Sequence, residues 1–220
     1  MAVSGGTFVP VPAESYQRVI AAVLGVTDAR AAQIAAEYPL TAYASPTLAL
    51  SALVGDANFA CTALQLDQWT AQRVPTFAYE FNDDAAPQRF APPGAFAPGA
   101  THSSELQYLF DLPNAPVPGT LNADQEALAA SMRAAWANFA ASGDPSSAAL
   151  PWPSFDDSAQ VMSLVLPQPQ VETGFSATHH CAFWAAVTGA RDHQGSDQGL
   201  ARVRRNPKRG SFSRDNNLRR

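Results

Sequence analysis

Basic residues are scarce over most of this chain. Residues 1–188 contain five, all arginine, against sixteen Asp and Glu, whereas residues 189–220 contain nine of the fourteen Lys and Arg. An acidic body of this kind argues against nucleic acid as its partner. The basic segment shows no apolar periodicity, which predicts a disordered, solvated tail; an arm for nucleic acid or an anionic membrane is the alternative.

Long hydrophobic runs are also missing. No uninterrupted stretch reaches the roughly 18 apolar residues of a membrane span, so no transmembrane segment is expected. The first fifteen residues lack the basic and apolar regions of a secretory signal, so none is expected here. Hydrophobic residues nevertheless make up 46% of the sequence and charged residues 15%. This balance supports a packed core and excludes disorder over the whole chain.

Several motifs that carry chemistry do not occur anywhere in the sequence. There is no G-x-S-x-G nucleophile elbow, no phosphate-binding P-loop, no G-x-G-x-x-G and no H-E-x-x-H. No residue can therefore be assigned as an elbow serine, and the sequence implies no cofactor.

Helix signals dominate the chain. The longest predicted helix begins at Asn122, where Gln125 completes a capping box, and ends at Gly143. Thr27 is predicted to cap another helix, and Ser45 followed by Pro46 marks a third start. Further helices are expected over about 16–24, 28–38, 56–71, from 103 and over 176–187.

Two segments read as strands. Residues 74–81 are rich in β-branched and aromatic side chains, and residues 161–166 form a short apolar run that ends at Pro167. We therefore predict a helix-rich α/β body over residues 1–188, followed by the basic tail over 189–220.

Histidine and cysteine provide the candidate functional groups. His102 lies in a predicted loop after the first strand. It is either a general base at the mouth of an α/β sheet or an ordinary surface histidine. His179 and His180 are adjacent, so on a helix their side chains diverge, and no metal site is expected. Cys61 and Cys181 are either buried thiols or a disulfide that closes a long loop.

Several blocks together resemble the type B carboxylesterase family. The family block G-x-x-H-x-x-E-x-x-[YF]-x-F is matched by Gly99 to Phe110, and W-x-x-F-A-x-x-G-x-P is matched by Trp136 to Pro145. Further matches occur at Gly55 to Cys61, at Leu150-Pro151-Trp152-Pro153 and at Cys181-Ala182-Phe183-Trp184. The blocks occur in the family's order over about residues 10–187.

The resemblance implies the C-terminal portion of an α/β-hydrolase fold. His102 then inherits the role of general base, Glu105 supports it from nearby, and Cys61 and Cys181 form a disulfide. The substrate would be a carboxylic ester, and the cysteine pair points to a secreted or extracytoplasmic protein. The nucleophile and the triad acid have no counterpart here, so we expect the chain to be inactive alone. The edge of strand 74–81 would lie open and allow self-association.

Two alternatives remain. The chain could be a non-catalytic binding module with an esterase-like fold, or a binding protein that acts through its basic tail. The intact block with His102 and Glu105 favours the esterase, because a binding module has no chemical need for a histidine there.

Overall fold

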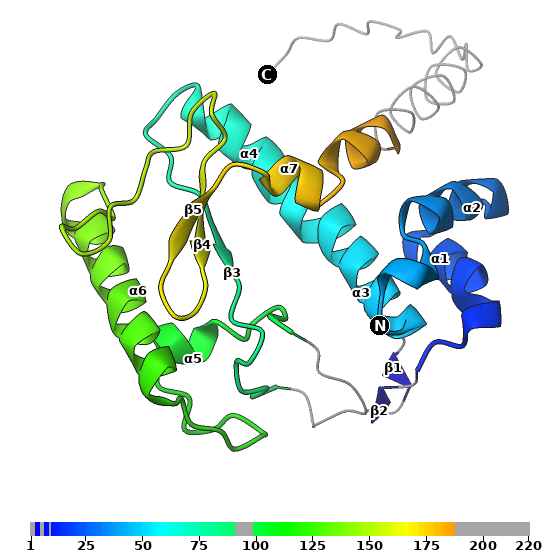
Figure 1. Cartoon of the computed structure of the whole chain (residues 1–220), viewed down its shortest axis with the longest axis horizontal. Helices are drawn as coiled ribbons and strands as arrows, with labels where there is room; N and C mark the ends of the chain where they lie inside the picture. The colour runs from blue at the N-terminus through cyan, green and yellow to red at the C-terminus, as the bar shows by residue number, and fades with distance from the viewer. Residues whose placement is uncertain (1–2, 5–6, 9, 91–98, 188–220) are drawn as a thin grey trace, which may run out of the picture. The chain divides into compact units, whose positions relative to one another are not determined.

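The computed structural model describes residues 3–4, 7–8, 10–90 and 99–187 (Figure 1). These residues fall into two compact units, Met1–Cys181 and Ala182–Arg220. In the second unit, residues 182–187 are helical, and the rings of Phe183 and Trp184 meet edge to face. The predicted tail at 189–220 lies outside the described residues.

The first unit is rich in helices. Its α-helices are α1 (Tyr16–Leu24), α2 (Asp28–Glu37), α3 (Pro46–Gly55), α4 (Cys61–Ala71), α5 (Leu106–Leu109), α6 (Ala123–Ser142) and α7 (Phe175–Thr178). A π-helical turn, Asp56–Ala60, joins α3 to α4 in one continuous run. Short 3-10 turns at Ala13–Ser15 and Leu40–Ala42 complete the helical content.

A small mixed sheet lies between the helices. Strand β3 (Tyr79–Phe81) pairs in parallel with β4 (Val161–Leu164), and β4 pairs antiparallel with β5 (Gln170–Glu172). Strand β4 is central and its four residues are buried. A separate hairpin near the N-terminus pairs β1 (Val3–Ser4) with β2 (Thr7–Phe8).

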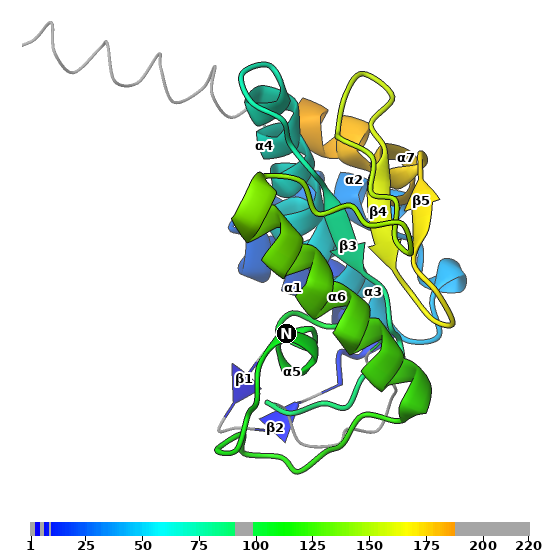
Figure 2. The same cartoon turned by 90° about the vertical axis from the view of Figure 1, so that its left-hand side faces the viewer.

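The two faces of β3 carry different chemistry, because alternate side chains of a strand point to opposite faces. Tyr79 contacts Trp136 of α6, and Phe81 contacts Tyr108 of α5. Glu80 lies on the other face, beside the segment that joins α7 to Cys181. Figures 1 and 2 show α5 and α6 on one side of the sheet and α4 and α7 on the other.

A buried carboxylate fastens α5 and α6 to the end of β3. Asp83 accepts a short hydrogen bond from the Tyr108 hydroxyl, and others from Gln125 Nε2 at 2.8 Å and the Ala85 amide at 3.0 Å. Burial and the hydrogen bond to Asp83 raise the pKa of Tyr108, so the phenol stays protonated. These donors offset the cost of burying the polar side chain of Asp83.

The predicted caps are confirmed. Thr27 accepts from the amide of Arg30, and Ser45 accepts from the amide of Leu48, each at the start of its helix. The capping box of Asn122 and Gln125 is complete at α6. Gly143 ends α6 with a φ of 79°, a left-handed value that costs glycine little. Local polar groups therefore fixed these boundaries as the sequence indicated.

Three predicted boundaries are wrong. The strand expected over 74–81 is paired only at Tyr79–Phe81, because Pro75 has no N–H and β4 starts opposite Tyr79. The strand expected over 161–166 ends at Leu164. The helix expected over 176–187 is interrupted at His180, whose φ of 52° is incompatible with a right-handed helix. The pattern also gave no sign of β5.

By length and composition alone, the helical run of residues 46–71 could cross a membrane. The helical segments Ala13–Leu24 and Asp28–Ala42 would also meet this criterion if they formed one span, although they are strongly bent against each other. This is weak evidence, because the core helix of a globular domain meets the same criterion. Residues 46–71 carry a buried aspartate, Asp56, and bury Leu50, Leu53 and Leu64 within the unit. The described residues thus contain no clear membrane-spanning helix.

Replacing the capping residue of the longest helix tests the local account of the fold. Asn122→Ala removes the acceptor for the Gln125 amide, so we expect the free energy of unfolding to fall by about 1 kcal/mol in urea denaturation. The matched control is Asn114→Ala in an exposed loop, expected to change stability by less than about 0.5 kcal/mol. Equal losses in both variants would contradict the assignment of the cap.

Candidate functional site

His102 lies in the turn that leads into α5, and its side chain is exposed. Its ring stacks at a tilt on the ring of Phe59, with 5.1 Å between centroids. Among the described residues, no hydrogen bond or ion pair engages the imidazole. The ring nitrogens are therefore available to another group, as the role of a general base requires.

The turn that carries His102 lies beside the end of β3. Asp84 follows β3 closely in sequence, and its Oδ1 accepts from the Ala100 amide at 3.4 Å. The carboxyl ends of sheet strands are where α/β folds usually gather their functional groups. The expected position of His102 at the mouth of the sheet is thus compatible with the geometry.

Glu105 immediately precedes α5 and is half-buried. Burial of Tyr79, together with the nearby negative charge of Glu105, raises the pKa of the Tyr79 phenol. Within the described part of the chain, Glu105 makes no hydrogen bond to His102. The supporting role expected for Glu105 therefore stays a prediction.

A cavity of about 920 Å³ opens next to the His102 turn. The π turn and α4 form one wall, β3 forms another, and the backbone of residues 99–101 closes a third. Its lining mixes apolar and acidic groups, including Phe59, Phe81, Asp56 and Glu80. The cavity is large enough for a small ligand or for side chains of another polypeptide segment.

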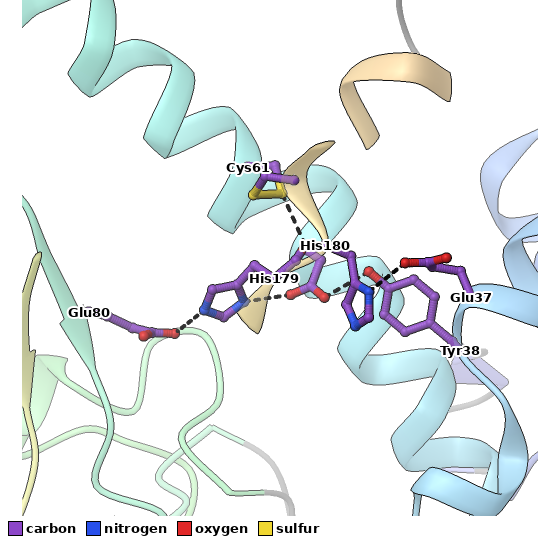
Figure 3. Close-up of a disulfide and its surroundings, with 8 residues drawn as sticks. Glu37, Tyr38, Cys61, Glu80, His179 and His180 are labelled. Carbon is purple, nitrogen blue, oxygen red and sulfur yellow. Dashed lines mark hydrogen bonds and ion pairs between the residues drawn. A yellow bond between two sulfur atoms is a disulfide. The ribbon is translucent and has the colours of Figure 1, made fainter. Parts of the chain in front are cut away.

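A second histidine, His179, lines this cavity. Figure 3 shows the ring of His179 between two carboxylates that come from different elements. Its Nδ1 lies 2.7 Å from Oδ1 of Asp56 in the π turn, and its Nε2 lies 3.0 Å from Oε1 of Glu80 in β3. The contact with Asp56 has hydrogen-bond geometry, whereas that with Glu80 is an ion pair without good alignment.

The two carboxylates hold His179 in its charged form. Burial of the ring disfavours the charge, but the contacts with Asp56 and Glu80 outweigh burial and raise the pKa of His179 to about 9. Burial also disfavours the charged form of Glu80 and by itself would raise the pKa of this carboxyl group. The contacts with His179 and Asn82 outweigh burial and lower the pKa of Glu80 overall. Near neutral pH the site is therefore a half-buried histidinium between the carboxyl groups of Asp56 and Glu80.

Further polar groups extend the network on both sides. The Tyr38 hydroxyl donates to Oδ2 of Asp56 at 2.8 Å. Asn82 Nδ2 lies 3.0 Å from Oε2 of Glu80 and 2.9 Å from Oγ of Ser163 in β4. The network thus links α2, the π turn, β3, β4 and the residues after α7.

The neighbouring His180 takes a different carboxylate. Its Nδ1 lies 2.7 Å from Oε1 of Glu37, and its ring packs at a tilt on Tyr38. The left-handed conformation of His180 turns the two adjacent rings toward separate partners. Among the described residues, no group of three His, Cys, Asp or Glu side chains is arranged to hold a metal ion.

The predicted disulfide is present. Cys61 at the start of α4 is bonded to Cys181, and Cys61 Sγ lies 3.2 Å from the carbonyl oxygen of His179 (Figure 3). The bond joins residues 120 positions apart in the sequence. It thereby fixes the chain next to His179 against the helix that follows the π turn.

No motif in the sequence indicates the role of His179. The adjacent His179 and His180 suggest metal ligands at most, and their diverging side chains argue against a metal site. The sequence did contain one indication, namely two acidic residues within apolar segments. Asp56 interrupts an apolar helical run, and Glu80 interrupts an apolar strand. Buried carboxylates need partners, and histidines were the main cationic candidates in a body with few arginines.

The charge of His179 predicts a pH-dependent stability. Because the folded-state pKa of about 9 exceeds the ordinary 6.5, the stabilisation is complete below about pH 6.5 and lost as pH rises through about 9. We expect His179→Gln to destabilise the protein by on the order of 2–3 kcal/mol near neutral pH, with a smaller difference above about pH 9. Urea denaturation across this range measures it.

His102→Gln is the matched control, because the exposed His102 ring makes no hydrogen bond or ion pair in the described part of the chain. It should leave the pH dependence of the wild-type protein in place. A difference between His179→Gln and wild type that stays constant from about pH 6 to 10 would contradict the charged site.

The disulfide makes a separate prediction. In the chain-entropy model a loop of 120 residues constrains the unfolded state by on the order of 4–5 kcal/mol. We expect Cys61→Ser combined with Cys181→Ser to lower the free energy of unfolding by several kcal/mol in urea. Thiol titration of the unfolded wild-type protein should find no free thiol before reduction and two after it. Two free thiols before reduction would contradict the bond.

Comparison with known proteins shows which family this chain is similar to. The sequence profile of the carboxylesterase family matches residues 17–184. Human cocaine esterase is 32% identical over 134 residues, which cover 60% of this chain and 23% of that protein. Rat acylcarnitine hydrolase is 31% identical over 136 residues, and acetylcholinesterase of Bungarus fasciatus is 30% identical over 142 residues. The two matches cover 60% and 62% of this chain, and 23% and 22% of those proteins.

The solved structure of a thermophilic pNB esterase has the same fold. It superposes with a TM-score of 0.54 at 20% identity, covering 77% of this chain and 33% of that one. The expected α/β-hydrolase fold class is thereby confirmed. The matched region spans less than a quarter of the curated relatives, so this chain represents a part of their architecture. The chain belongs to the carboxylesterase family.

Proposed function

We propose that this chain supplies the histidine general base of a serine carboxylic-ester hydrolase. His102 would take the proton from an attacking serine and later pass it to the leaving alcohol. The observation that carries the proposal is an exposed histidine beside the end of β3, inside the block Gly99 to Phe110, whose ring makes no hydrogen bond or ion pair with any described residue. Glu105 would support the histidine from the start of α5.

The nucleophile must come from other polypeptide. The 220 residues contain no G-x-S-x-G sequence, so the proposed reaction needs a segment that presents a serine to His102. The cavity of about 920 Å³ beside the His102 turn offers room for such a segment. The triad acid would arrive with it, since no carboxylate contacts the His102 ring within the described residues.

The free edge of β3 is the natural place for this segment to add. The carbonyl of Ala78 and the amide of Asn82 bond to β4, so the backbone groups of Tyr79 and Phe81 point away from it. In the described part of the chain, no strand pairs with that side of β3. An open edge covered by helices on both faces favours a further strand. Without one, two copies of this chain would pair there.

Activity measurements on the purified chain test the proposal. We expect no turnover of a p-nitrophenyl ester above the buffer rate, and no stoichiometric labelling by a fluorophosphonate. Adding the product of an adjoining reading frame that encodes G-x-S-x-G should restore both. In the restored enzyme, His102→Ala should lower kcat by about 10⁴-fold or more, because a catalytic triad without its general base loses most of its rate acceleration.

His180→Ala is the control variant, because His180 pairs with Glu37 on another part of the unit. It should retain kcat within about threefold. Light scattering adds a check on the open edge: self-associated chain alone should become a one-to-one complex with the added product. Robust hydrolysis by the purified chain alone, or full activity of the restored His102→Ala enzyme, would refute the proposal.

A further inference from the structure

The turn that carries His102 is held by polar side chains from the segment after β3. Gln88 makes contacts on both sides of Ala100: its Nε2 donates to the Gly99 carbonyl at 3.3 Å, and its Oε1 accepts from the Thr101 hydroxyl at 2.8 Å. Gln88 Nε2 also donates to the carbonyl of Ala86 at 3.1 Å, which fixes the amide in its own loop. The Gln88 amide therefore ties two neighbours of His102 to one point.

The rest of the turn is held equally tightly. The hydroxyl of Ser104 donates to the Thr101 carbonyl at 2.6 Å. Gln107 Nε2 donates to the carbonyls of Pro87 at 2.7 Å and Ser104 at 3.1 Å, so α5 is bound to the same loop. These contacts surround His102 in the chain, and none of them involves its imidazole.

The backbone at the turn adopts conformations that need such support. Ser103, directly after His102, has a φ of 74°, a left-handed value that is strained for a residue other than glycine. Gly99 has a φ of 72°, and a Cβ there would lie 3.3 Å from the carboxylate of Asp84. A strained residue beside a candidate proton carrier persists only where surrounding contacts fix it.

We infer that Gln88 is a positioning residue for His102, acting through Thr101 and Gly99 to hold the imidazole over Phe59 at the edge of the cavity. The inference rests on the proposed function, because positioning matters for catalysis only if His102 transfers the proton. Proton transfer requires hydrogen-bond reach, and small misplacements of a reacting group lower rates severely. Contacts that fix the backbone on both sides of Ala100 limit such displacement.

Three substitutions separate positioning from general stability. Thr101→Val keeps the shape of the side chain and removes the hydroxyl that donates to Gln88, whereas Thr101→Ser keeps a hydroxyl. Gln88→Met keeps the length of the side chain and removes its contacts with Gly99 and Thr101. Gln17→Met is the matched control, because the exposed side chain of Gln17 in α1 donates to the carbonyl of Asp28 and, among the described residues, makes no contact with the His102 turn.

The first readout uses the full chain alone. The rings of His102 and Phe59 lie 5.1 Å apart, so their protons should give a nuclear Overhauser effect in solution. We expect this signal to weaken at least twofold in Gln88→Met and Thr101→Val. Thr101→Ser and Gln17→Met should retain it. An unchanged signal in both Gln88→Met and Thr101→Val overturns the inference whatever their stability.

The second readout uses the enzyme restored with its serine-bearing segment. Gln88→Met and Thr101→Val should lower kcat about 10- to 100-fold with KM within about threefold, and Thr101→Ser should recover most of the rate. Loss of activity in His102→Ala together with full activity in Gln88→Met and Thr101→Val overturns the inference alone. Full activity in His102→Ala overturns the proposed function itself.

Discussion

The ion pairs of His179 with Asp56 and Glu80 join three parts of the unit that are far apart in the sequence. Asp56 lies in the π turn between α3 and α4, Glu80 lies in β3, and His179 comes after α7. Each carboxylate is largely removed from water, and an unpaired buried charge is costly. The three groups therefore stabilise the fold only together, and the disulfide beside them keeps His179 in reach.

The same contacts explain why β3 has two unlike faces. The face toward α5 and α6 is aromatic and packs by edge-to-face contacts, which need only apolar area and suitable geometry. The face toward α4 and α7 presents Glu80 and Asn82 to a network that ends at Ser163. The cavity of about 920 Å³ is lined by Glu80 and Asn82 and also by Tyr79 and Phe81, so its wall is both charged and aromatic. On the side of α6, a smaller apolar cavity of about 320 Å³ is lined by Tyr79, Trp136 and Phe139.

His102 differs from His179 in every physical respect that matters for chemistry. His179 is half-buried, paired with two carboxyl groups and charged near neutral pH, which makes it a stabilising group. His102 is exposed, and its ring has no polar partner in the described residues, while the turn around it is fixed by Gln88, Gln107 and Ser104. A free imidazole on a firmly held turn is what a proton carrier needs.

The sequence by itself determined the helices whose ends carry local signals, such as the capping box at Asn122 and the left-handed glycine at Gly143. It also determined the family, through the spacing of the blocks around His102 and the two cysteines. These features depend on neighbours within a few residues, or on motifs that keep their spacing. The tertiary structure alone decided the length of β3, the existence of β5, the break at His180 and the partners of His179. The partners of His179 and His180 lie far away in the sequence, 123 residues for Asp56 and 143 residues for Glu37. The length of β3 and the existence of β5 depend on where β4 lies, and no local pattern specifies which group or strand arrives.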